Sequence, residues 1–143
     1  MKNKLALIII TTTMALTLNG QNLKGHLWKN RVVLIITNDS ESENYASQLE
    51  EFKMHNQEFE ERKLIVYKIL PNKYKLQSNT DNSWVKSSDL YIKYKPTNSA
   101  FRLILIGLDG GIKIEQNELL TAKELFLTID AMPMRRAEIK NEP

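Results

Sequence analysis

Short runs of apolar, mostly β-branched residues recur along the chain and predict the strands of a buried sheet. The run Arg31–Thr37 (RVVLIIT) is apolar at every interior position, as in a strand that is covered on both faces. Runs of the same kind occupy residues 63–70 and 101–107. Residues 112–115 (IKIE) alternate instead, which predicts a partly exposed strand that returns after a tight turn at Asp109-Gly110-Gly111. The pattern therefore predicts four strands.

Helical periodicity predicts an amphipathic helix between the first two strands. Its apolar positions lie three, four and seven residues apart, with charged residues between them. These positions are Tyr45, Leu49, Phe52 and Phe59. Ser40 and Glu43 have the spacing of a capping box at the start of this helix, and Asp39 is a competing N-cap. We expect one helix that continues to about Arg62.

A second amphipathic helix is expected near the end of the chain. Thr121 and Glu124 have the spacing of another capping box. The apolar residues that repeat at helical spacing after it are Ala122, Leu125, Phe126, Ile129 and Met132. Pro133 should end or kink this helix, because proline has no amide hydrogen and its ring clashes with the preceding turn.

Residues 71–100 show no clear periodicity and are expected to form an irregular insertion. Residues 79–83 (NTDNS) have the composition of a loop. Ser87 and Ser88 are alternative caps of a short helix, which has to stop before Pro96.

The order of these elements, β-α-β-(α)-β-β-α, predicts an α/β protein with a minimal thioredoxin-like fold. A helix between the first two strands makes them parallel through a right-handed crossover. The last two strands form an antiparallel hairpin, and the expected sheet order is 2-1-3-4. Residues 23–140 are expected to form this one domain, because a chain of 143 residues leaves no room for a second.

The amino-terminal residues predict export. Lys2 and Lys4 precede an uncharged apolar run from Leu5 to about Leu18, and small and polar residues follow, which is the layout of a signal peptide over residues 1–20. This run of ~14 residues is shorter than the ~20 that span a bilayer, so a membrane anchor is the weaker alternative. No cysteine follows the run, which excludes a lipoprotein anchor. We therefore expect a periplasmic or secreted protein without a stable membrane anchor after cleavage.

Charge and cysteine content exclude several classes of protein. The chain has 20 Lys+Arg and 17 Asp+Glu residues, and removal of Lys2 and Lys4 leaves 18 basic against 17 acidic residues. The two signs are interspersed, so no nucleic-acid partner is expected. The sequence has no cysteine, which excludes disulfides, thiol chemistry and cysteine–zinc sites. Thiol–disulfide oxidoreductase and thiol peroxidase activities are therefore not expected.

No catalytic residue, metal site or cofactor is predicted. A thioredoxin-type thiolate would lie at the amino end of the first helix, where this chain has residues 37–42 (TNDSES). The acidic residues of this segment suit a helix cap but repel a bound anion, and its serines have no evident base beside them. His26 and His55 are too few for a histidine-based metal site.

Three segments of the chain resemble a known family. They are LWKNRVVLII (residues 27–36), LIGLDGGIKI (residues 105–114) and LFLTIDAMPMRRAE (residues 125–138). Together they resemble the thioredoxin-like family known as domain of unknown function 4174, which is itself similar to a domain of vertebrate sushi-repeat and coiled-coil-containing matrix proteins. The resemblance covers about residues 23–140. It implies a thioredoxin-like fold and an exported location, and it implies no established activity.

The expected topology gathers charged residues of these segments at one end of the sheet, opposite the redox site of thioredoxins. The predicted cluster consists of Trp28, Arg31, Asp109, Lys113, Asp130, Arg135 and Arg136. In a structural interpretation, the last two arginines pair with Asp130 or Asp109 and hold the final helix to the hairpin. In the alternative interpretation the cluster is a docking surface, because arginine, tryptophan and methionine are enriched at protein interfaces.

Two functions are compatible with the sequence. The first is an exported, non-catalytic thioredoxin-like module that binds a protein or a component of the cell envelope. The second is a cysteine-free enzyme of peroxiredoxin-like ancestry, with a polar site at the amino end of the first helix and a role in oxidative-stress defence. The sequence does not predict an oligomeric state.

Overall fold

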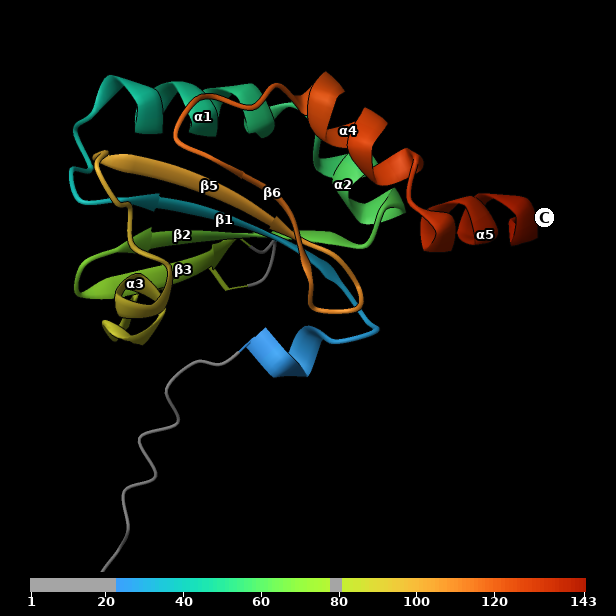
Figure 1. Ribbon diagram of the computed structural model, residues 1–143, viewed down its shortest axis with the longest axis horizontal. Coiled ribbons are helices and arrows are strands. Elements are labelled where there is room, and N and C mark those ends of the chain that lie inside the picture. Colours follow the sequence, from blue (N-terminus) through green and yellow to red (C-terminus); the bar gives the residue numbers. More distant parts are fainter. Residues whose placement is uncertain (1–22, 78–80) are drawn as a thin grey trace, which may run out of the picture.

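The strand Arg31–Thr37 (β1) lies inside a six-stranded sheet and is buried along its whole length. The computed structural model describes residues 23–77 and 81–143, so the predicted signal peptide lies outside the described residues. On one side, β1 pairs in parallel with Leu64–Leu70 (β2). On its other side, β1 pairs antiparallel with Phe101–Ile106 (β5). The other strands, in a sheet of order β4-β3-β2-β1-β5-β6, are Lys73–Gln77 (β3), Val85–Lys86 (β4) and Ile112–Gln116 (β6) (Figure 1).

The predicted α/β class and the order of the four predicted strands are confirmed, since β2-β1-β5-β6 is the expected order 2-1-3-4. The sequence did not predict β3 and β4, which extend the sheet beyond β2 inside the segment expected to be irregular. In β3 the sequence KYKLQ alternates polar and apolar residues, but five residues are too few for this alternation to stand out. Pro71 therefore lies in a turn between two paired strands and not at the end of the sheet.

Helices cover both faces of the sheet and make a three-layered structure (Figure 1). The helices on one face are α1 (Glu43–Lys53), α2 (Asn56–Glu61) and α4 (Ala122–Asp130). Those on the other face are α3 (Asp89–Tyr94) and the 3-10 helix η1 (Leu23–His26). Each face has its own apolar core, and this two-sided burial is the reason that continuous apolar runs predicted the strands. Within the described residues, no helix combines the length and the hydrophobicity needed to cross a membrane.

The predicted helix between β1 and β2 is two helices, because the chain breaks at Met54 and His55. His55 is the N-cap residue of α2, and its ring packs edge-on against Phe126 of α4 with the ring centroids 5.5 Å apart. Phe59 packs against the same ring at 5.6 Å. The break thus brings α2 against α4, and the prediction of one continuous helix to Arg62 was wrong.

The predicted capping box of α4 is confirmed. The Thr121 hydroxyl accepts a hydrogen bond from the Glu124 amide, and the Glu124 carboxylate accepts one from the Thr121 amide, each at 3.2 Å. A buried side chain of α1 reinforces this end of α4: Gln48 accepts from the Leu120 amide and donates to the Leu120 carbonyl oxygen, both at 2.8 Å. Local and tertiary hydrogen bonds therefore fix the same helix start.

The predicted capping box of α1 does not form. Its N-cap residue is Ser42, whose side chain makes no capping hydrogen bond. Asp39, the competing cap, accepts instead from the Glu41 amide at 2.9 Å and closes a local turn ahead of the helix. This turn moves the start of the helix beyond Ser40, so Glu43 becomes the first helical residue and is not in the third position that the box requires.

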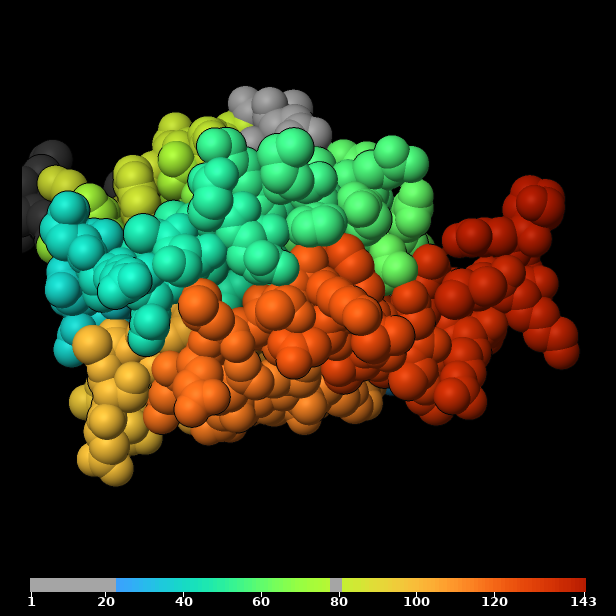
Figure 2. Space-filling view, turned by 90° about the horizontal axis from the view of Figure 1, so that it is seen from above, coloured from blue at the N-terminus to red at the C-terminus, as the bar shows by residue number. Residues whose placement is uncertain are grey.

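The chain continues as a helix after Pro133, which the sequence pattern did not predict. Helix α4 ends at Asp130, and Pro133 is the first residue of α5 (Pro133–Asn141). Proline suits this position because the first helical amide has no partner in any case. Figure 2 shows α5 projecting from one end of the molecule, beyond α4. The buried residue of α5 is Arg135, so this helix adds almost no apolar surface to the core.

Replacement of Thr121 by alanine should destabilise the protein, because it removes the hydroxyl that caps α4. We expect the free energy of unfolding to fall by about 0.5–2 kcal/mol in urea denaturation. Ser42→Ala is the matched control, since Ser42 is also an N-cap residue but its hydroxyl makes no capping hydrogen bond. Equal losses in the two variants would show that the capping box of α4 adds no stability.

Candidate functional site

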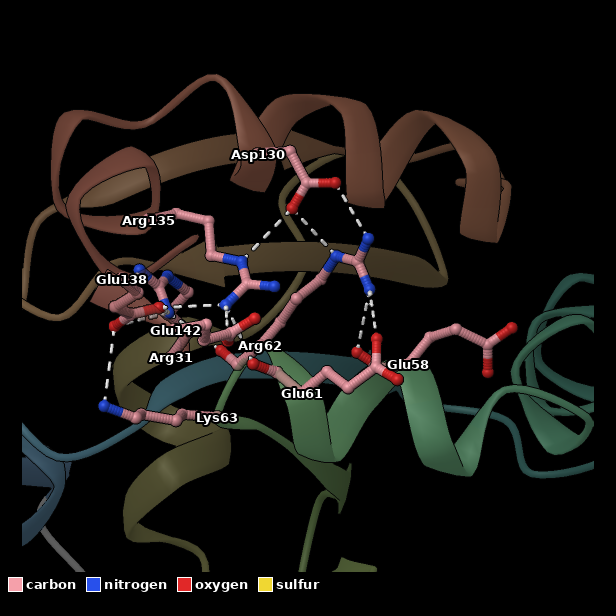
Figure 3. A network of polar contacts seen from close by, with 9 residues as sticks. All are labelled: Arg31, Glu58, Glu61, Arg62, Lys63, Asp130, Arg135, Glu138 and Glu142. Atoms are coloured by element: carbon pink, nitrogen blue, oxygen red, sulfur yellow. Dashed lines mark hydrogen bonds and ion pairs between the residues drawn. The ribbon is translucent and has the colours of Figure 1, made fainter. Parts of the chain in front are cut away.

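Segments that are far apart in the sequence meet at the amino end of β1. Arg31 begins β1, Arg62 lies between α2 and β2, and Asp130 ends α4. Arg135 and Glu138 lie on α5. Figure 3 shows the side chains of these five residues gathered together, and we call them the arginine network.

The pair of Arg62 and Asp130 has the best geometry in the arginine network. The Asp130 carboxylate accepts from Nε of Arg62 at 3.0 Å and from Nη2 at 2.8 Å, which is a bidentate arrangement. Nη1 of the same guanidinium donates to the Glu58 carbonyl oxygen at 3.1 Å, and its central carbon lies 4.3 Å from the centroid of the Phe126 ring. These contacts fasten the end of α4 to the end of α2.

Arg135 and Arg31 share the carboxylate of Glu138. Arg135 donates to the last carbonyl oxygen of α2 at 3.0 Å and lies 3.4 Å from both Asp130 and Glu138. Arg31 donates to the Arg62 carbonyl oxygen at 2.8 Å and lies 3.2 Å from Glu138. The side chain of Arg135 is 6% exposed and that of Arg31 is 1% exposed, so both charges are removed from bulk water.

Asp109 and Lys113 form a separate ion pair in the hairpin between β5 and β6, with 2.9 Å between Nζ and the carboxylate. Asp130, and not Asp109, is therefore the aspartate that pairs with Arg135. The hydrogen bond from Lys113, followed by that from the Gly111 amide, lowers the pKa of Asp109. Gly110 has a φ of 79° at the tip of this turn, as expected from its place in the predicted hairpin.

Trp28 and Arg136, the other members of the predicted cluster, lie outside the arginine network. The side chain of Trp28 is 65% exposed, and its amide donates to the Leu108 carbonyl oxygen at 2.8 Å. This hydrogen bond ties the segment after η1 to the hairpin. Arg136 is exposed, and its side chain makes no ion pair with another residue in the described part of the chain. The two adjacent arginines therefore have different roles.

The sequence did not identify Arg62 and Glu138. Arg62 lies two residues before Leu64, the first residue of β2, and the parallel pairing of the two strands puts Leu64 opposite Arg31, the first residue of β1. Parallel strands begin at the same edge of a sheet, so this placement was a usable signal. Glu138 could not be found in this way, because it depends on α5, which was not predicted.

A pocket of about 470 Å³ opens between the hairpin turn and the connection from α4 to α5. Its walls include Arg31 of β1, Leu108, Asp109 and Lys113 of the hairpin, and residues 131–134. We call it the hairpin pocket. A smaller hollow of about 260 Å³, beside η1 and α3, shares Asp109 with it. The end of the sheet at which the charged cluster was predicted is therefore hollowed around the hairpin turn.

Local hydrogen bonds surround Thr37 at the carboxyl end of β1, where thioredoxin-type chemistry would lie. The buried Thr37 hydroxyl donates to the Asp39 carbonyl oxygen at 2.9 Å. The Ser42 hydroxyl is buried and has no hydrogen-bond partner among the described residues, so no base activates it there. In residues 23–77 and 81–143, no three His, Asp or Glu side chains are placed to hold a metal ion.

His26 forms a polar contact that sequence reasoning did not predict. Asn30 donates to its Nδ1 with 3.2 Å between the atoms, so Nε2 carries the hydrogen and donates to the Tyr67 hydroxyl at 2.8 Å. Burial, and then the positive charge of Lys29, lowers the pKa of His26. The neutral imidazole thus connects η1 to the buried strand β2.

Arg135→Ala should lower the free energy of unfolding by about 1–3 kcal/mol, because it leaves a carbonyl oxygen of α2 and part of the Glu138 carboxylate without a donor. Arg136→Ala is the matched control, and its change should stay within about 0.5 kcal/mol. Urea unfolding of the two variants beside the wild type measures both values. Equal effects would contradict the structural role assigned to Arg135.

Acidification should lower the free energy of unfolding more in the wild type than in a His26→Gln variant. The pKa of His26 is lower in the folded protein than the unfolded value of about 6.5, so the unfolded chain takes up the proton first as the pH falls. The neutral ring therefore contributes its full amount to the free energy of unfolding above the unfolded pKa of about 6.5, and this contribution is lost as the pH falls from there through the folded pKa. Urea unfolding of both proteins at pH 7.5 and pH 5 tests this, and an identical pH dependence would show that His26 is not the group responsible.

Comparisons with known proteins identify a family for the sequence and a similar structure for the fold. The model of the family described as "Domain of unknown function (DUF4174)" matches residues 22–138. No curated protein matches the sequence significantly. Among solved structures, the chain is similar to the reduced 2-Cys peroxiredoxin of Plasmodium vivax, with a TM-score of 0.56 and 14% identity, over 82% of this chain and 85% of that chain.

At this level of identity the structural likeness shows the fold alone, and it confirms the predicted thioredoxin-like class in a chain that has no cysteine. The match of the family model likewise confirms the resemblance carried by the segments around Arg31, Asp109 and Arg135. The chain belongs to the family described as domain of unknown function DUF4174.

Proposed function

We propose that this protein is an exported, non-catalytic thioredoxin-like module that binds its partner at the amino end of β1. The hairpin pocket carries the proposal. Its volume of about 470 Å³ falls in the range of ligand sites, and its walls combine apolar side chains with Arg31 and Lys113. The lack of cysteine removes the redox chemistry of the fold, so binding is the function that the geometry supports best.

The exported location is supported by the order of basic, apolar and small polar residues over positions 1–20. An exported module meets proteins and components of the cell envelope, and these are the partners that we propose. The charge balance of the chain argues against a nucleic acid.

A cysteine-free enzyme of peroxiredoxin-like ancestry is the second candidate. The observation that favours it is His26, whose lowered pKa keeps a neutral imidazole beside the smaller hollow. However, Nδ1 of His26 accepts from Asn30 and Nε2 donates to Tyr67. Both ring nitrogens are therefore engaged, and neither is available to take a proton from a substrate.

Expression of the full chain in a Gram-negative host tests the proposal. The protein should be recovered from the periplasm or the medium, with a mass that corresponds to cleavage between Thr17 and Gln21. The purified protein should consume hydrogen peroxide and a small disulfide no faster than buffer. Retention of the uncleaved chain in the cytoplasm would contradict export, and turnover that disappears in His26→Gln would establish the enzyme instead.

A further inference from the structure

The arginine network contains more buried positive charge than buried negative charge. Its three arginine side chains are 1%, 13% and 6% exposed, whereas its two carboxylates, on Asp130 and Glu138, are 34% and 18% exposed. The nearby carboxylates of Glu61 and Glu142 are 50% and 62% exposed and lie 3.9 and 3.5 Å from their arginines, so water screens them. Buried charges are stable only when they are paired, and the arginines of the network are more deeply buried than the carboxylates that pair with them.

Within the described part of the chain, Arg31 is the member of the network whose guanidinium has an unpaired donor. Its Nη1 donates to the Arg62 carbonyl oxygen and approaches Glu138, but its buried Nε has no hydrogen-bond partner among the described residues. An unpaired donor on a buried cation is unfavourable, because it has lost its water without gaining a replacement. Arg31 also lines the hairpin pocket, so the pocket lies beside this incompletely paired side chain.

The other walls of the hairpin pocket favour an anion with an apolar chain. Lys113 is neutralised by Asp109, so this pair adds no net charge. The amino end of α5 lies in the wall, and its first turn contains no acidic residue to offset the positive end of the helix dipole. Leu108 and residues 131–134 supply apolar surface, and the flexible methionines among them can move to admit a ligand to Arg31.

We propose that the hairpin pocket binds the carboxylate of a small amphipathic acid, with the carboxylate on Arg31 and the apolar chain along Met132 and Met134. The planar guanidinium matches the planar carboxylate, and the apolar walls select against an inorganic anion. This inference rests on the binding function proposed above and names its ligand class. A free acid and the carboxyl-terminal residue of a peptide both carry this chemistry.

Calorimetric titration of the purified protein with octanoate and with octanamide tests the proposal. Octanoate should bind, and octanamide should bind at least about tenfold more weakly, because a neutral head group cannot make the charge-assisted hydrogen bond. A tetrapeptide ending in leucine, with a free or an amidated carboxyl terminus, separates the two sources. Binding of octanoate alone assigns a free acid, and binding of the free-carboxyl peptide assigns a protein terminus. Failure of both acids to bind overturns the proposal, and so does equal binding of octanamide.

Variants locate the site. Ala131→Phe fills the pocket from an exposed position that is not part of the arginine network, and Arg31→Lys keeps the charge but removes Nε and the planar guanidinium. Each should weaken octanoate binding at least about tenfold. Lys86→Met is the matched control, since it removes a positive charge from exposed β4 at the far edge of the sheet, and it should leave the affinity within about twofold.

Unchanged affinity in Ala131→Phe would place octanoate elsewhere and overturn the assignment, even if Arg31→Lys fails to fold. The titrations are independent of the export and turnover measurements. The titrations can therefore reject this ligand class while the export and turnover measurements still support the proposed function. They can also detect octanoate binding in a protein that is not exported or that shows turnover.

Discussion

The burial of the Arg31 guanidinium is the constraint on which this end of the protein depends. Strand β1 is covered on both faces and yet begins with a charged residue that is 1% exposed. A charge in that position is stable only with partners. They come from the end of α2, through the Arg62 carbonyl oxygen, and from α5, through Glu138.

This constraint explains how α5 is held. Its buried residue is an arginine, so the hydrophobic effect contributes little to its attachment. Arg135 and Glu138 instead connect the helix to the end of α2 and to β1. The same contacts fix the connection from α4 to α5, which forms one wall of the hairpin pocket. The pocket and the arginine network are therefore two parts of one arrangement, and loss of the network should also disturb the pocket.

The sequence could predict most of the central sheet, and through it part of the candidate site. Strands buried on both faces leave continuous apolar runs, and a known strand order then decides at which end Arg31, Asp109 and Asp130 lie. The strands β3 and β4 leave no such signal, because they are short and rich in polar residues.

Contacts within the site were harder to predict than its location. The choice of Asp130 over Asp109 as the partner of Arg135 depends on how α5 leaves α4. Proline can end a helix or begin one, and the sequence pattern predicted that Pro133 ends or kinks α4 and did not predict the helix that begins at it. Glu138 lies on α5, which the periodicity of the sequence did not predict.

The distribution of acidic residues over the helix ends connects the missing redox site with the pocket. In thioredoxin-type chemistry an anion is stabilised at the amino end of the first helix. Among the α-helices of the described residues, the first turns of α1 to α4 contain Glu43, Glu58, Asp89 and Glu124, which occupy or repel the place of an external anion. The first turn of α5 has no acidic residue, and this helix begins beside Arg31. If the hairpin pocket binds a carboxylate, the helix end that receives an anion has moved from α1 to α5, at the opposite end of β1.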